Sequence, residues 1–165
     1  MKTVGPKAEQ RNRGLLQHAE TGGATYFLTF SARPGESFSR EERALILASC
    51  RFGYPARWLL HGAVVMPDHV HLLLTPQRIA PNAPQWFSLA EIVKSIKGVT
   101  ARQINRLRGR SGGSIWQKDY YDRSIRDEAD FQVKLNYMAQ NPVRRGLVAE
   151  TQEWDAIDLC GWSQQ

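Results

Sequence analysis

The stretch Val64-Val65-Met66-Pro67-Asp68-His69-Val70-His71-Leu72-Leu73-Leu74 decides the fold. Met66-Pro67-Asp68 is typical of a turn, because proline fixes φ and an aspartate side chain can bond its own backbone. The aliphatic runs on either side predict the two strands of a hairpin. Side chains alternate between faces along a strand, so His69 and His71 share one face. The opposite face, directed into a core, carries Val70, Leu72 and Leu74.

Two imidazoles on one face of a strand can converge on a single metal ion. Histidines on the solvated face of a sheet are also common, so the pair alone is compatible with either interpretation. A third ligand and a nucleophile elsewhere in the chain would favour the metal site.

Composition predicts one globular domain with a real core, since the chain has 165 residues and is 42% hydrophobic. No apolar run is long enough for a membrane span or a signal peptide, so we expect no membrane partner. Cys50 and Cys160 lack the spacing of metal ligands or of a disulfide framework. Reduced thiols in the cytoplasm are therefore expected.

The formal net charge of +6 favours a polyanionic partner, with nucleic acid first. Part of this charge is concentrated in residues 94–110, which contain no acidic residue. An uninterrupted basic run is either a solvated helix face or a surface that contacts phosphates. Its members are Lys94, Lys97, Arg102, Arg106, Arg108 and Arg110.

The expected elements alternate in a split βαβ order, which predicts an α+β fold. We expect a four-stranded antiparallel sheet with two helices on one face, and a third, additional helix. The expected strands are residues 24–30, 57–65, 69–75 and 114–125, and the expected helices are residues 40–51, 88–107 and 127–141. Pro142 is expected to end the third helix, because proline disfavours helical geometry in the residue before it.

The sequence also predicts where the helices begin and which segments flank the central domain. Ser39 with Glu42 forms a capping box for the first helix, which is expected to bury Ala44, Leu45, Leu47 and Ala48. The second helix should begin after Ser88.

We expect the chain to divide into three segments: a flexible basic arm (residues 1–23), a central domain (residues 24–148) and a tail (residues 149–165). Residues 108–113 should form a flexible linker, and the tail tryptophans Trp154 and Trp162 could pack on the body or stack on bases.

The third helix supplies what the histidines lack. Tyr137 and Asn141 are four residues apart, which places them on one helix face. Tyrosine can act as a nucleophile, and an asparagine carbonyl oxygen can bind a metal. Each residue also has an ordinary explanation: core packing for Tyr137, and a cap before proline for Asn141.

Four blocks of the chain resemble the REP-associated tyrosine transposases of the HUH single-tyrosine superfamily. The blocks are residues 64–74, 116–122, 125–128 and 137–148, and the resemblance covers about residues 24–148. Two positions depart from the family pattern, since Arg123 replaces a frequent histidine and Ser124 an aliphatic residue. The tail also lacks the usual run of serines.

This resemblance implies a ferredoxin-like HUH endonuclease fold whose additional helix carries the tyrosine. It implies metal-dependent cleavage of single-stranded DNA at hairpin-forming repeats, a covalent 5′-phosphotyrosine intermediate and a free 3′-hydroxyl. His69 and His71 match the HUH pair, Asn141 the third ligand of a Mg²⁺ or Mn²⁺ ion, and Tyr137 the nucleophile. A transposase of this class would work in the bacterial cytoplasm, at the nucleoid.

The positively charged residues expected to contact the DNA backbone are Lys94, Lys97, Arg102, Arg106, Arg144 and Arg145.

The sequence leaves the nucleophile, the function and the oligomeric state open. On chemistry alone, the other candidate nucleophiles besides Tyr137 are Tyr54, Tyr120 and Tyr121. One rival function is a hairpin-binding module that does not cleave, and another is a metal-dependent phosphodiesterase that uses water. The chain could act as a monomer or as a homodimer.

Overall fold

Antiparallel pairing of β1 (Tyr26–Ser31) with β3 (His69–Pro76) forms the centre of the sheet. The computed structural model describes residues 20–160. Five strands follow the order β4-β1-β3-β2-β5, and the other strands are β2 (Trp58–Val65), β4 (Tyr121–Ser124) and β5 (Ile157–Leu159). The order of the first four strands is that of the expected split βαβ fold, so the α+β class is confirmed.

The fifth strand and the length of β4 correct the expectation from sequence. β5 lies in the segment predicted as a tail and pairs with β2. The fourth strand was expected over residues 114–125, but regular pairing is confined to Tyr121–Ser124. Upstream, Trp116 makes an isolated bridge to Ala32 and is only 5% exposed. Burial of the Trp116 side chain, rather than a strand ladder, holds that part of the chain.

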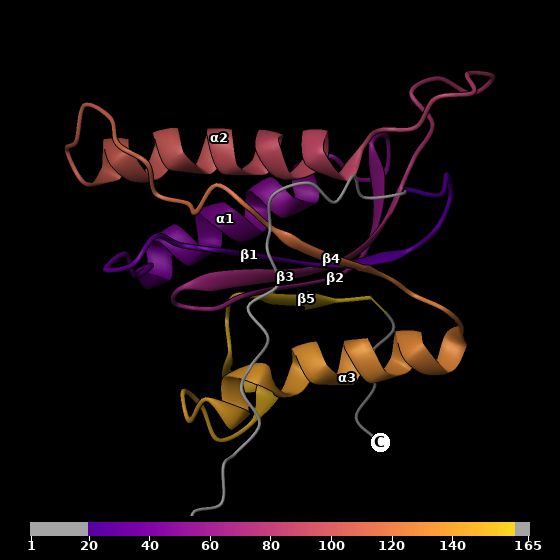
Figure 1. Cartoon of the computed structure of the whole chain (residues 1–165). Helices are drawn as coiled ribbons and strands as arrows, with labels where there is room; N and C mark the ends of the chain where they lie inside the picture. Colours follow the sequence, from indigo (N-terminus) through magenta and orange to yellow (C-terminus); the bar gives the residue numbers. More distant parts are fainter. Residues whose placement is uncertain (1–19, 161–165) are drawn as a thin grey trace, which may run out of the picture.

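Helices α1 (Arg40–Phe52) and α2 (Leu89–Leu107) cover one face of the sheet (Figure 1). Both begin with a capping box, Ser39 with Glu42 and Ser88 with Glu91, as the sequence predicts for Ser39. The buried stripe of α1 is rotated from its expected position. Ala44 and Ala48 are exposed, and Ile46 and Cys50 are buried in their place.

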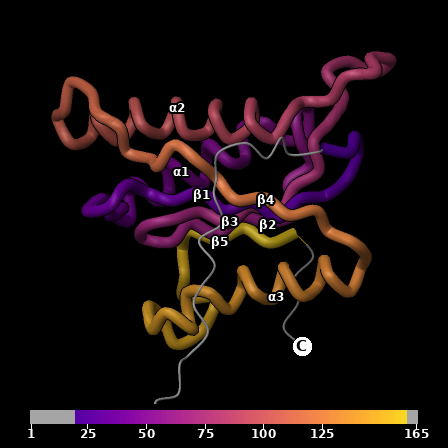
Figure 2. The backbone as a smooth tube through the Cα atoms, viewed as in Figure 1, coloured from indigo at the N-terminus to yellow at the C-terminus, as the bar shows by residue number. Residues whose placement is uncertain are grey.

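Helix α3 (Glu128–Arg144) covers the opposite face of the sheet, together with the chain that leads to β5 (Figures 1 and 2). The close approach depends on Gly62 at an irregularity of β2. A Cβ at Gly62 would lie 3.1 Å from Leu159, 3.2 Å from Met138 and 3.4 Å from Leu135. The missing side chain therefore lets α3 and β5 pack tightly on β2.

The expected end of α3 at Asn141 is wrong. The helix continues through Pro142, and its last residue is Arg144. Gly146, two residues further on, turns the chain away from the helix axis with a φ of 68°, a conformation that suits glycine. Gly146 N donates to Val143 O, and Leu147 N donates to Pro142 O, which is the Schellman pattern. A buried proline is tolerated here although it removes one helical hydrogen bond.

The flanking segments are held more firmly than the sequence predicts. In the expected linker, Arg108 donates to Glu36 and Glu42, and the bond to Arg108 holds the pKa of Glu42 below its usual value despite partial burial. Trp154 is buried, as its packing alternative predicts, and donates to Val65 O at 3.1 Å. Trp162 and residues 1–19 of the expected arm lie outside the described residues.

The last described part of the arm contacts the body. The carboxylate of Glu20 accepts a hydrogen bond from Leu89 N at 3.0 Å, at the first turn of α2.

No helix within residues 20–160 combines the length and the apolar character that crossing a membrane requires.

Gly53, the C-cap of α1, tests the packing at the start of β2. A Cβ there would lie 2.1 Å from ring carbons of Trp58, which is 2% exposed and cannot move aside. We expect Gly53→Ala to lower the free energy of unfolding by about 1–3 kcal/mol through overpacking, measured by urea denaturation. Gly112→Ala is the control, because no heavy atom lies within 4 Å of its added Cβ. Equal stability of the two variants would contradict this account.

Candidate active site

His71 lies on β3, on the face covered by α3, and is 5% exposed. It pairs across the sheet with Thr29, and Thr29 Oγ1 lies 2.7 Å from His71 Nδ1. His71 Nε2 is buried and has no hydrogen-bond partner within residues 20–160. When Nδ1 donates to Thr29, Nε2 keeps a free lone pair, which is the form of imidazole that binds a metal.

The surroundings of His71 keep its ring neutral. Burial lowers the pKa of His71 to about 3, and the positive charges of His69, Lys134 and Arg144 act in the same direction. A neutral imidazole is available as a ligand throughout the physiological pH range, because no proton has to be displaced from it.

His69 is half-buried beside His71, with 4.7 Å between the ring centroids. Its Nδ1 lies 2.7 Å from Asp68 Oδ1, and the other oxygen of Asp68 lies 3.5 Å from Arg145 Nη2. Such a carboxylate partner fixes the orientation of a ligating imidazole. The two expected ligands are therefore brought together, and each has a partner on Nδ1.

Tyr137 extends from α3 toward His71 on the sheet. Its ring centroid lies 5.4 Å from that of His71 and 5.9 Å from that of Phe27. Tyr137 is 38% exposed, which argues against core packing as its role.

The rival tyrosines lie in different surroundings. Tyr54 is exposed and follows α1, on the other side of the sheet. Burial, with the charges of Asp122 and Glu20, raises the pKa of Tyr120 to about 12, which disfavours its ionised form. Tyr121 is exposed and lies opposite Thr29 on the edge strand, so it shares the face of His71.

Asn141 lies one turn after Tyr137 and is 6% exposed. Because α3 continues to Arg144, Asn141 is inside the helix, and its alternative role as a cap before proline is wrong. Within residues 20–160, no group of three His, Cys, Asp or Glu side chains is arranged to hold a metal ion. Asn141 is therefore the candidate third ligand that the sequence offers from outside these residue types, and its assignment stays a prediction.

Two cations of α3 surround Tyr137. The Arg144 guanidinium carbon lies 4.5 Å from the ring centroid of Tyr137, and Arg144 Nη2 donates to Tyr137 O at 3.3 Å. Lys134 Nζ lies 5.9 Å from the same centroid and 5.0 Å from that of Phe27. Sequence reasoning missed Lys134, although its position three residues before Tyr137 places it on the same helix face.

The expected DNA-contacting residues divide between two faces of the molecule. Arg144 and Arg145 lie beside the histidines, whereas the four from α2 lie across the sheet from them (Figure 1). Lys97 Nζ donates to three backbone carbonyls, at 2.9 Å for Gln117, and burial lowers its pKa. The Lys97 ammonium is therefore used to hold the backbone of residues 117–119. The exposed members on α2 are Lys94, Arg102 and Arg106.

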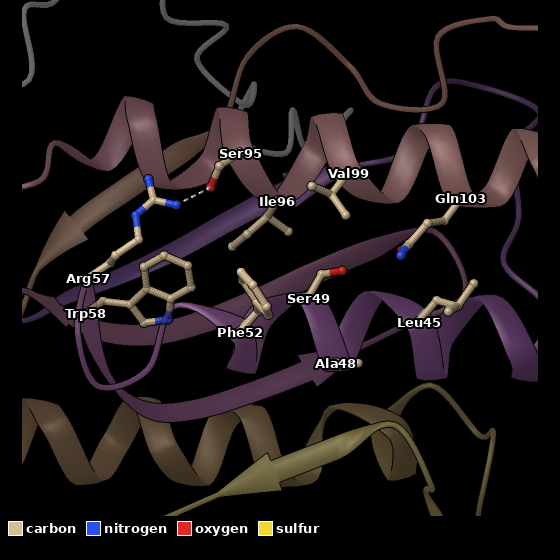
Figure 3. Close-up of a pocket in the computed structure, with 10 residues that line it drawn as sticks. All are labelled: Leu45, Ala48, Ser49, Phe52, Arg57, Trp58, Ser95, Ile96, Val99 and Gln103. Carbon is tan, nitrogen blue, oxygen red and sulfur yellow. Dashed lines mark hydrogen bonds between the residues drawn. The ribbon is translucent and has the colours of Figure 1, made fainter.

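A hollow of about 300 Å³ lies between α1 and α2, away from the histidines (Figure 3). The indole of Trp58 and the exposed ring of Phe52 line it, and Arg57 donates to Ser95 at 3.5 Å near one end. No His, Cys, Asp or Glu is among its lining residues, so the hollow is distinct from the candidate metal site.

The sheet, the histidine pair and Tyr137 on α3 form the arrangement that the resemblance to the tyrosine transposases predicts. The sequence model of the family "Transposase IS200 like" matches residues 55–141, more than half of the chain. The chain belongs to this family, and the resemblance to the REP-associated tyrosine transposases is confirmed.

Two relatives and one solved structure support this family assignment. A Haemophilus influenzae protein whose name places it among the REP-associated tyrosine transposases is 27% identical over 148 residues, covering 81% of this chain and 78% of its own. The Escherichia coli REP-associated tyrosine transposase is 24% identical over 135 residues, covering 80% and 74%. The structure of a REP-associated tyrosine transposase bound to a REP hairpin shares the fold, with a TM-score of 0.66 at 20% identity over 87% of this chain and 81% of that one.

The low pKa of His71 makes a prediction for stability. An unfolded His71 takes up a proton near pH 6.5 and the folded one only near 3, so the unfolded state binds more protons between these values. The stability that neutral His71 contributes is present above pH 6.5 and is lost as the pH falls toward 3. In EDTA, the free energy of unfolding should fall more steeply between pH 6 and 4 for the wild type than for His71→Asn, by up to about 1.4 kcal/mol per pH unit.

Urea denaturation at several pH values measures this difference. His61, whose pKa burial also lowers, is present in both proteins and cancels in the comparison. Parallel pH dependences would show that folded His71 titrates normally.

Proposed function

We propose that this chain is a metal-dependent endonuclease and strand transferase that acts on single-stranded, hairpin-forming DNA through Tyr137. The observation that carries the proposal is the buried, unpartnered Nε2 of His71 beside the accessible ring of Tyr137. Membership of the transposase family makes DNA the substrate class. The solved relative bound to a REP hairpin supports a hairpin as the ligand.

The residues present fit a divalent metal ion. His69, His71 and Asn141 would hold it, which gives two imidazole nitrogens and one amide oxygen as neutral ligands. Three protein ligands leave positions for a phosphate oxygen and for water. Nitrogen ligands suit Mn²⁺ better than Mg²⁺. Such an ion, when bound, polarises a phosphate oxygen and orients the scissile bond.

In the proposed reaction, Tyr137 Oη forms a bond to phosphorus and the bond from phosphorus to the 3′-oxygen breaks. The phenol proton passes to water, and the leaving oxygen takes up a proton to become a 3′-hydroxyl. The 5′ end of the downstream strand stays on Tyr137 as a phosphodiester. One diester replaces another, so a 3′-hydroxyl can reverse the step, as strand transfer requires.

Tyr137→Phe should abolish formation of the covalent adduct while DNA binding remains, because only the nucleophilic oxygen is removed. Labelled single-stranded hairpin oligonucleotides from the flanks of the gene are incubated with protein and Mn²⁺ or Mg²⁺. Adducts are then resolved on denaturing gels. Tyr54→Phe is the matched control, and Tyr121→Phe tests the other exposed tyrosine on the same face as His71.

The rivals make different predictions in the same assay. If the DNA is cleaved without forming an adduct, and Tyr137→Phe still cleaves it, water is the nucleophile. Binding without cleavage in either metal would indicate a module that only holds hairpins.

Asn141→Ala should weaken Mn²⁺ binding by at least about tenfold, since it removes the proposed oxygen ligand. Electron paramagnetic resonance of free Mn²⁺ during titration measures the affinity without any DNA. Asn82→Ala, at an exposed loop position, is the control and should bind Mn²⁺ as the wild type does. Unchanged affinity in Asn141→Ala would remove Asn141 from the ligand set.

A further inference from the structure

Lys134 lies in the same part of α3 as the candidate nucleophile. It is half-buried and precedes Tyr137 by about one helical turn, so Lys134, Tyr137 and Asn141 follow one another along a single helix face. Its ammonium lies 5.0 Å from the Phe27 ring centroid, and Phe27 stacks on His71 with 5.1 Å between centroids.

The Lys134 ammonium has no carboxylate partner among residues 20–160. Three other cations of this region have carboxylate partners, because Arg123 and Arg126 both contact Asp130 and Arg145 contacts Asp68. The guanidinium of Arg144 donates to the backbone oxygen of Tyr137. Lys134 instead lies over the faces of two aromatic rings. Ring faces attract a cation more weakly than a desolvated carboxylate does.

The one carboxylate within one turn of Lys134 on α3, Asp130, is bound by Arg123 and Arg126. His71 and Arg144 are neighbours of Lys134, and the charge of Lys134 contributes to the low pKa of His71. Holding a half-buried cation beside other cations, with no carboxylate partner among residues 20–160, costs free energy. An anion that enters beside Tyr137 would recover that cost, and the scissile phosphate is such an anion.

We propose that Lys134 is a catalytic residue that binds a non-bridging oxygen of the scissile phosphate. This inference rests on the proposed function. Lys134 exchanges no proton and no electron pair in the step. It acts as a fixed positive charge that is closest to the phosphate when negative charge builds up on the non-bridging oxygens during attack by Tyr137.

The test compares single-turnover rates of adduct formation for wild type and Lys134 variants at saturating Mn²⁺. Lys134→Gln should slow the step by about 10²–10³-fold, the range for loss of one preorganised donor. Lys134→Met, which keeps the aliphatic stem against Phe27, should be equally slow and covers the case in which glutamine disturbs packing. Lys134→Arg should recover most of the rate. Lys118→Gln, which removes an exposed charge, is the matched control and should change the rate less than about twofold.

A second substrate separates catalysis from structure. A methylphosphonate at the mapped scissile position replaces the charged non-bridging oxygen with a methyl group, so Lys134 loses its proposed partner. The difference between wild type and Lys134→Met should then shrink to less than about tenfold. A difference that stays as large as on the phosphodiester would overturn the proposal, and so would a Lys134→Met variant with the wild-type rate. Absence of adduct from the wild type would instead overturn the proposed function.

Discussion

Strand β3 is buried on both of its faces, and the rest of the structure depends on this constraint. Val70, Leu72 and Leu74 face α1 and α2, while the histidines and Leu73 face α3. A sheet covered on one side only would leave both imidazoles in water. Here His71 is removed from solvent, which makes its protonated form unfavourable and leaves Nε2 without a partner.

The position of α3 in turn depends on local features at several points. Asp127 caps its first turn, and Gly62 allows it to approach β2 closely. Pro142 stays inside the helix, so Asn141 projects from a regular turn and keeps its spacing from Tyr137. Had the helix ended at Asn141, this residue would be a cap and its amide would be used by the backbone.

Local patterns in the sequence were sufficient to predict much of this arrangement. Alternation predicted the shared face of His69 and His71, and side-chain chemistry predicted the capping box of Ser39 with Glu42. The periodic pattern could not place β5, because three half-buried residues after a polar segment give little signal. The helix end was wrong because the rule for residues before proline is a tendency, and tertiary packing of the buried Pro142 outweighed it.

The fold by itself does not identify the activity. Function is therefore determined by the side chains at the site. His69, His71 and Tyr137 lie within residues 55–141, the part of the chain that the transposase family model matches.

Formal charge predicts the nucleic-acid surface of this protein poorly, because many of its cations have internal partners. Arg108 is bound to Glu36 and Glu42, Lys97 to backbone carbonyls, and Arg145 to the carboxylate that orients His69. An exposed cation that meets DNA contributes salt-dependent affinity that is similar for every phosphate. A half-buried cation that has no carboxylate partner among residues 20–160 differs, since its interaction with an incoming anion is stronger and directed at one position. Lys134 is such a cation, and it lies beside the one side chain proposed to attack phosphorus.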